Sequence, residues 1–256
     1  MQMLYEDDGI EISFEPGNNA TAIVSFSGIG MKMGGVQIEE FKKSLAGTDN
    51  SVYYVKDKDR HWYNSSFDRI GDVINEDFAK RNIGRVLTLG NSMGGFGAIA
   101  FAKVLKGCQA AIAFSAQSAI DPSVVPWDRR YRKFTDSVSQ WVGLDAAKML
   151  VPHVNYKLFY GDVSNFDTRH AQRMANADHA NLSVYVMAGA GHGVAGFLKR
   201  KGVLHPLVQA LIADGGQDFD ASTILQSLNY KTLQPAPGVS ARRAQRPARP
   251  GIRSAI

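Results

Sequence analysis

One serine near the middle of the chain stands among an unusual number of glycines. Residues 86–89 (Val-Leu-Thr-Leu) have the composition of a buried strand, and the alanine-rich run 98–106 is typical of a helix. Between them, the pentapeptide 90–94 (Gly-Asn-Ser-Met-Gly) fits G-x-S-x-G, a sharp strand-to-helix turn that presents a serine as a nucleophile. The turn requires small residues because Cβ atoms on either side of the serine would collide. The alternative is a glycine-rich turn in which Ser92 only caps the helix.

A serine hydroxyl becomes a useful nucleophile at neutral pH when an imidazole accepts its proton and a carboxylate orients that imidazole. His192 follows the predicted strand 182–187 in a glycine-rich loop, where the backbone can aim a ring. Asp162 follows the predicted strand 156–160 and is the preferred carboxylate, because it is closest to the strand end. Asp167 is the alternative carboxylate, and its other possible role is to cap the helix that follows.

The remaining pattern predicts the elements that must position these three side chains. A hairpin joins residues 4–5 to residues 11–15, and strands then alternate with helices. This alternation indicates a mainly parallel sheet with helices on both faces, whose functional residues lie at the carboxyl ends of the strands. The strands are expected over 21–26, 51–55, 86–89, 110–114, 156–160 and 182–187, and the helices over 36–45, 67–81, 98–106, 167–176, 203–213 and 222–228.

The serine turn and the chain order serine, aspartate, histidine resemble the α/β-hydrolase superfamily over about residues 21–213. The resemblance implies the α/β-hydrolase fold with a short cap-like insertion, about residues 121–151, after the strand that follows the helix of the serine turn. It also implies an oxyanion hole made by the backbone N–H groups of Met93 and Ile29. Ile29 lies in a loop where many relatives carry a His-Gly pair and this chain has Ser27 in place of the histidine.

Two segments beyond strand ends carry aromatic and basic residues that could bind a substrate. Trp62 and Tyr63 lie in the first segment, and Trp127, Arg130 and Tyr131 lie in the insertion. Aromatic rings can stack on a sugar or cover an acyl chain, and an arginine can pair with an acidic group. The alternative is an insertion with an ordinary solvated basic face. Residues 121–132 are similar to a segment of uncharacterised bacterial hydrolases associated with polysaccharide synthesis, which favours carbohydrate esters.

Composition excludes several other classes of protein. The 256 residues are 45% apolar, which suits one α/β-hydrolase domain over residues 1–233. The tail, 234–256, is rich in Pro, Ala and Arg and is expected to be disordered. Its five arginines match the net charge of +5, so the folded part is neutral and a nucleic-acid surface is not expected.

Other absences narrow the expected chemistry. The single cysteine excludes an internal disulfide and a cysteine-based metal cluster. We find no metal-ligand cluster, dinucleotide motif or phosphate loop, so no cofactor is expected. No apolar stretch reaches the roughly 20 residues of a membrane span, and the acidic N-terminus does not look like a secretory signal. The cytoplasm is therefore the expected compartment.

These observations predict a cofactor-independent serine hydrolase that cleaves a small-molecule or carbohydrate ester through an acyl-enzyme. One alternative is an acyltransferase that uses the same residues and passes the acyl group to an alcohol or sugar. Another is a non-catalytic accessory protein of a polysaccharide or secretion system built on the same scaffold.

Overall fold

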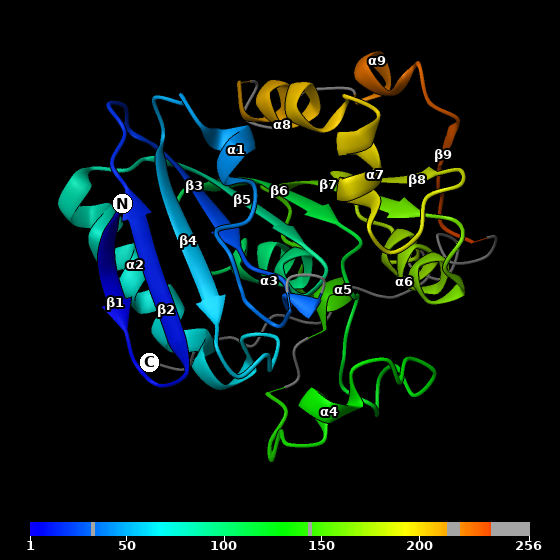
Figure 1. Ribbon diagram of the computed structural model, residues 1–256, viewed down its shortest axis with the longest axis horizontal. Helices are drawn as coiled ribbons and strands as arrows, with labels where there is room; N and C mark the ends of the chain where they lie inside the picture. Colours follow the sequence, from blue (N-terminus) through cyan, green and yellow to red (C-terminus); the bar gives the residue numbers. More distant parts are fainter. Residues whose placement is uncertain (32–33, 143–144, 214–220, 237–256) are drawn as a thin grey trace, which may run out of the picture.

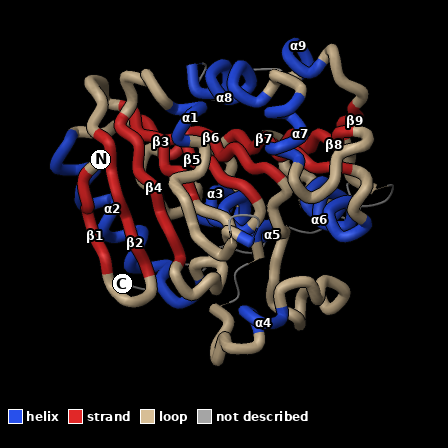
Figure 2. Tube along the Cα trace, viewed as in Figure 1, coloured by secondary structure: helices blue, strands red, loops and turns tan. Residues whose placement is uncertain are grey.

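A single sheet of nine strands organises the part of the chain that the structure describes (Figures 1 and 2). The computed structural model describes residues 1–31, 34–142, 145–213 and 221–236, so most of the predicted tail lies outside the described residues. The strand order is β1-β2-β4-β3-β5-β6-β7-β8-β9. The strands are β1 (Gln2–Glu6), β2 (Ile10–Glu15), β3 (Thr21–Phe26), β4 (Ser51–Asp57), β5 (Arg85–Asn91), β6 (Cys108–Phe114), β7 (Asn155–Gly161), β8 (Leu182–Met187) and β9 (Tyr230–Thr232).

The strands from β4 to β8 in this order are parallel, and the outer strands β1, β2 and β9 pair antiparallel. The central strands are buried on both faces, which explains why most of their residues are apolar. The predicted hairpin and the predicted mainly parallel sheet are therefore confirmed. Their consequence is that the carboxyl ends of β5, β7 and β8 meet along one edge of the sheet.

Helices cover both faces of the sheet (Figure 2). Three helices, α2, α3 and α6, pack on one face together with the short α5, and α1, α7, α8 and α9 pack on the other. The predicted helix 67–81 is confirmed as α2, whose buried residues Ile70, Ile74 and Phe78 recur at every fourth position. The helices are α1 (Lys42–Leu45), α2 (Phe67–Arg81), α3 (Met93–Phe101), α4 (Arg132–Thr135), α5 (Ala146–Met149), α6 (Asn165–Ala175), α7 (Val194–Arg200), α8 (Leu204–Ala213) and α9 (Ser222–Leu225).

The predicted helix 36–45 is wrong over most of its length, because only Lys42–Leu45 is helical. The preceding carbonyl groups are bound from outside the segment. The Ser27 hydroxyl donates to the Ile38 carbonyl at 2.7 Å, and the Ser25 hydroxyl donates to the Glu40 carbonyl at 2.8 Å. These hydrogen bonds hold residues 38–40 in a loop beside the end of β3, where they face the site described below.

Two short elements, α7 and β9, were not expected from the sequence, and α3 begins five residues earlier than the predicted helix. It starts at Met93, directly after the serine, so the turn and the helix are continuous. In the part of the insertion that the structure describes, 121–142 and 145–151, the only helices are the four-residue α4 and α5, as the loss of pattern there indicates. Among the described residues, no helix has the length and apolar character needed to cross a membrane.

Gly94 allows the start of α3 to pack closely on β3, and this contact leads to a stability prediction. A Cβ atom on Gly94 would lie 2.0 Å from the Phe26 carbonyl oxygen, closer than any real contact. We expect Gly94→Ala to destabilise the fold by about 3 kcal/mol or more, measured as a lower midpoint of urea unfolding. Gly84 is the matched control, because it is exposed and a Cβ there meets nothing within 4 Å. Equal midpoints for the two variants would contradict the packing argument.

Candidate active site

Ser92 lies in a strained turn between β5 and α3. Its backbone has φ 57° and ψ −118°, a conformation that costs energy for any residue other than glycine. A Cβ on Gly90 would lie 2.0 Å from the Gly94 carbonyl oxygen, so strand and helix approach each other too closely for side chains at these positions. The Ser92 N–H donates to the Phe114 carbonyl at 2.8 Å, which ties the turn to β6. The fold thus holds this serine in a strained conformation at the carboxyl end of β5.

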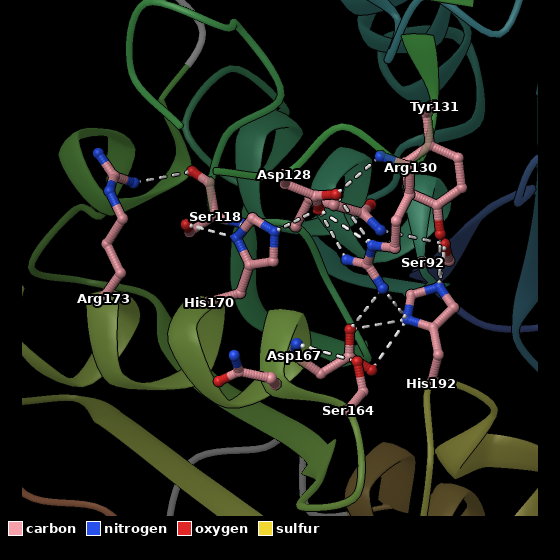
Figure 3. Close-up of polar contacts among 12 residues, drawn as sticks. Ser92, Ser118, Asp128, Arg130, Tyr131, Ser164, Asp167, His170, Arg173 and His192 are labelled. Atoms are coloured by element: carbon pink, nitrogen blue, oxygen red, sulfur yellow. Dashed lines mark hydrogen bonds and ion pairs between the residues drawn. The ribbon is translucent and has the colours of Figure 1, made fainter. Parts of the chain in front are cut away.

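His192 reaches the serine from the loop after β8 (Figure 3). The distance between the Ser92 Oγ and the His192 Nε2 is 2.9 Å. The His192 Nδ1 lies 2.9 Å from both carboxylate oxygens of Asp167. Because an ionised carboxylate only accepts, Nδ1 carries the proton and Nε2 is free to accept one from the serine.

The carboxylate that meets His192 is that of Asp167, and the predicted pairing with Asp162 is not formed. Asp162 is exposed at the end of β7, and its Oδ1 accepts the Gly189 N–H at 2.8 Å. Asp167 lies one turn into α6, where the Ser164 Oγ caps the helix and accepts the Asp167 N–H at 3.3 Å. The first turn of α6 therefore places Asp167 at the site, while Asp162 binds a backbone N–H of the loop that leads to His192.

A cavity of about 170 Å³ opens beside Ser92 and His192. Ile29 lies in its wall, and the Tyr63 hydroxyl donates to the Ser27 carbonyl at 2.6 Å, which fixes the loop. Met93 is the first residue of α3, so its N–H has no acceptor within the helix. The cavity is lined by Gly28, Ile29, Gly30, Met31, Ile38, Glu40, Asn91, Ser92, Tyr131, His192 and Gly193.

Glu40 was not expected from the sequence, because the segment that carries it was predicted to be helical. Its carboxyl group lies in the cavity wall, where its Oε1 accepts the Gly28 N–H at 3.2 Å. Burial raises the pKa of Glu40 to about 7, although the Gly28 hydrogen bond opposes this shift. The cavity therefore contains a carboxyl group that changes charge near neutral pH.

Most of the aromatic residues predicted to bind substrate lie elsewhere. Trp62 and Tyr63 are fully buried in the core, and neither lines the cavity. The Trp62 Nε1 donates to the Gln117 Oε1 at 3.1 Å. Trp127 packs its ring 4.6 Å from the ring of His170, and it also lies outside the cavity lining. An aromatic residue that lies outside a predicted strand can belong to the core or to a binding surface. The sequence pattern does not distinguish these two positions.

Arg130 was predicted to bind substrate and does lie at the site, but its guanidinium is bound by carboxylates of the protein itself. Its Nη1 donates to the Asp167 Oδ1 at 3.0 Å, and its Nη2 donates to the Asp128 Oδ2 at 2.7 Å (Figure 3). Both carboxylates are almost fully buried, at 1% and 0% exposure. Burial alone would raise the pKa of Asp128, but hydrogen bonds from His170 and Arg130 outweigh it and hold that pKa well below its usual range. Arg130 therefore connects the insertion to the carboxylate that orients His192.

A second line of serine, histidine and aspartate lies behind the first (Figure 3). The Ser118 N–H donates to the His170 Nδ1 at 3.0 Å, and the His170 Nε2 lies 2.9 Å from the Asp128 Oδ2. Nδ1 is thus the acceptor and Nε2 carries the proton, the opposite tautomer to His192. Burial lowers the pKa of His170 despite the opposing effect of Asp128, so the ring is neutral at neutral pH. The hydrogen bond from His170 therefore helps to hold the Asp128 carboxylate that pairs with Arg130.

Two further residues contact the serine or its histidine: Tyr131, which was predicted as a substrate contact in the insertion, and Gln117, which was not predicted. The Tyr131 hydroxyl lies 3.0 Å from the His192 Nε2, and the Gln117 Nε2 donates to the Ser92 Oγ at 3.3 Å. The orientation of the Gln117 amide follows from Trp62, whose indole N–H can only donate to the Gln117 oxygen. The aromatic, basic composition of the insertion was a signal for Tyr131, whereas nothing in the sequence around Gln117 indicates its role.

No protein-family model matches this chain, and no curated protein matches its sequence. Solved structures are similar in shape. The chain is similar to the capsule O-acetyltransferase of Neisseria meningitidis serogroup A, with a TM-score of 0.57, 13% identity, and coverage of 79% of this chain and 93% of that one. It is also similar to an acylaminoacyl peptidase of Pyrococcus horikoshii, with a TM-score of 0.61, 13% identity, and coverage of 87% of this chain and 43% of that one.

A third similar structure is a carboxylesterase of the thaumarchaeon Nitrososphaera gargenis, with a TM-score of 0.50, 11% identity, and coverage of 85% of this chain and 100% of that one. These proteins share an architecture with this chain while sharing little sequence. Three observations agree with one another: the mainly parallel sheet, the strained serine turn after β5 and the similar solved structures. This chain has the α/β-hydrolase fold.

Proposed function

We propose that this protein cleaves a carboxylic ester through an acyl-enzyme formed on Ser92. The observation that carries the proposal is the unbroken line of hydrogen bonds from Ser92 through His192 to Asp167, at 2.9 Å for each step. A serine of this kind needs a base to accept its proton and a carboxylate to fix the tautomer of that base. His192 and Asp167 meet these two requirements at one edge of the sheet.

The proposed reaction uses only side chains and backbone groups of this chain. Ser92 attacks the ester carbonyl while His192 accepts the serine proton, and Asp167 stabilises the imidazolium that forms. The proposed donors to the oxyanion are two backbone N–H groups. One belongs to Met93, which follows Ser92, and the other belongs to Ile29, which lies in the loop after β3. His192 then protonates the leaving alcohol, and a water molecule, activated by the same histidine, releases the acid.

The cavity and the similar proteins guide the choice of substrate. A volume of about 170 Å³ is small beside the roughly 300–1,000 Å³ of drug-sized ligand sites, which favours a short acyl group such as acetyl. The similar structures include a carboxylesterase and an O-acetyltransferase, two activities that begin with transfer of an acyl group. An ester of a small molecule or a carbohydrate is therefore the proposed substrate class.

The first prediction concerns the nucleophile. Ser92→Ala is expected to lower turnover of p-nitrophenyl acetate on the order of 10⁴- to 10⁶-fold, because no acyl-enzyme can form. The fold should persist, since the substitution removes a single hydroxyl group. Fluorophosphonate labelling, followed by mass spectrometry, should mark Ser92 in the wild type. An unreactive Ser92 in folded protein would favour a non-catalytic accessory role instead.

A second prediction separates the two aspartates. Asp167→Asn is expected to reduce kcat by about 10⁴-fold, because an amide cannot stabilise the imidazolium and can impose the wrong tautomer. Asp162→Asn is the matched control and should keep kcat within a few-fold, since its partner is a backbone N–H of the loop. If the two variants lose the same activity, the assignment of Asp167 is wrong.

The third prediction concerns pH. Glu40 is neutral below about pH 7 and ionised above it, and a negative charge in the cavity repels the oxyanion of the transition state. We expect kcat/KM for p-nitrophenyl acetate to fall by roughly tenfold above pH 7 in the wild type. The same decline should be absent in Glu40→Gln, whose side chain stays neutral.

Glu39→Gln is the control for this pH experiment. Glu39 pairs with Lys56 at 2.8 Å, and this pair holds the pKa of Glu39 below its usual value although partial burial would raise it. Glu39 is therefore ionised throughout the pH range, and its variant should keep the alkaline decline. A decline that persists in Glu40→Gln would remove Glu40 from the explanation.

A further inference from the structure

Tyr131 brings a second hydroxyl group to the nitrogen that accepts the proton of Ser92 (Figure 3). The Tyr131 Oη lies 3.0 Å from the His192 Nε2, and the Ser92 Oγ lies 2.9 Å from the same atom. A neutral imidazole offers one lone pair at this nitrogen, so the two hydroxyl groups compete for it. Burial raises the pKa of Tyr131, which keeps its hydroxyl protonated at neutral pH.

The ring of Tyr131 is held by its neighbours. It packs 5.3 Å from the ring of the fully buried Trp62, and the Arg130 guanidinium lies 5.3 Å from its centre. Arg130 in turn is bound by the carboxylates of Asp128 and Asp167. Tyr131 is therefore a positioned part of the cavity wall, and its hydroxyl is directed to the reacting groups.

The place that Tyr131 occupies matters most after the acyl-enzyme has formed. The oxygen that attacks the acyl group must give its proton to the His192 Nε2, so it must come within hydrogen-bond distance of that nitrogen. A water molecule that enters there replaces the hydrogen bonds of Tyr131 with its own and gains no other contact. A larger alcohol also contacts the cavity wall at Ile29 and Ile38, and these contacts offset the displacement of the tyrosine hydroxyl.

We propose that the Tyr131 hydroxyl disfavours water at acylated Ser92, so that this site passes the acyl group to an alcohol acceptor faster than it hydrolyses it. The proposal rests on the function proposed above, because it requires an acyl-enzyme. In the transfer, the acceptor hydroxyl gives its proton to His192 as its oxygen bonds to the acyl carbon. The bond from that carbon to the Ser92 Oγ then breaks, and Ser92 recovers the proton from His192.

The test measures how the acyl-enzyme divides between water and an alcohol. The wild type and Tyr131→Phe are given p-nitrophenyl acetate as donor with glycerol or glucose as acceptor, and free acetate and acetyl ester are quantified by NMR. Tyr131→Phe keeps the ring but removes the hydroxyl, which leaves room for water beside His192. We expect the ratio of acetate to acetyl ester to rise about tenfold in this variant.

Tyr54→Phe is the matched control for loss of a tyrosine hydroxyl. The Tyr54 hydroxyl is buried in the sheet and has no hydrogen-bond partner among the described residues, so this variant should keep the wild-type ratio. Ser92→Ala supplies the rate of the uncatalysed reactions. Urea unfolding checks that Tyr131→Phe is folded.

The outcomes separate this proposal from the proposed function. An unchanged ratio in Tyr131→Phe, or a wild type that makes acetate but no acetyl ester with either acceptor, overturns the role of Tyr131 and leaves ester cleavage standing. An equal loss of the p-nitrophenol burst and of both products would make Tyr131 a general participant in acylation, which also overturns the proposal. Absence of a burst and of acetylated Ser92 in the wild type would remove the proposed function and this inference together.

Discussion

The buried carboxylate of Asp167 is the constraint on which the rest of the site depends. A charged group with 1% exposure must be paired, because removing one partner from a buried ion pair costs about 3–5 kcal/mol. His192 satisfies both carboxylate oxygens at 2.9 Å, but a neutral imidazole supplies no charge. Arg130, which belongs to the insertion, supplies the positive charge that pairs with Asp167. The insertion is thus bound to the site by an ion pair rather than resting on it as a loose cover.

This constraint extends outward through a second carboxylate. Arg130 is held between Asp167 and Asp128, and Asp128 also accepts a hydrogen bond from His170 of α6. The two helix residues Asp167 and His170 lie one turn apart, so one face of α6 holds both ends of the network. Because Tyr131 follows Arg130 in the chain, the same contacts that neutralise Asp167 also direct a tyrosine hydroxyl to His192. The charge balance at Asp167 and the shape of the cavity are therefore coupled.

Much of the fold could be predicted from the sequence, because strand and helix patterns are set by local burial. The run 21–26 is apolar on both faces, and α2 repeats its apolar residues at helical spacing, so both were recognised. The segment 36–45 misled the prediction because hydroxyl groups of Ser25 and Ser27, distant in the sequence, bind its carbonyl groups. No local pattern contains that information, and the position of Glu40 in the cavity wall was lost with it.

The site was predicted in part for a similar reason. Ser92 and His192 were recognised because each follows a strand end in a glycine-rich turn, and the structure brings them together. Which of Asp162 and Asp167 faces His192 depends on how the chain turns at the cap of α6. The two residues are only five positions apart, and the distance from the strand end along the sequence does not predict that turn. Trp62 was expected near a substrate, but its burial depends on packing against distant residues such as Gln117.

The two lines of serine, histidine and aspartate show why residue types alone do not make a reactive group. Ser118 is fully buried, and its N–H and its hydroxyl both lie on the His170 Nδ1, at 3.0 Å and 2.9 Å, so the backbone N–H competes with the hydroxyl for the one lone pair of that nitrogen. Ser92 lies in a strained turn beside a cavity, and its backbone N–H is directed away to Phe114, which leaves the His192 Nε2 for hydroxyl groups. The difference lies in which nitrogen carries the proton and in where the backbone N–H points. The reactivity proposed for Ser92 thus depends on the backbone of the turn as much as on the three side chains.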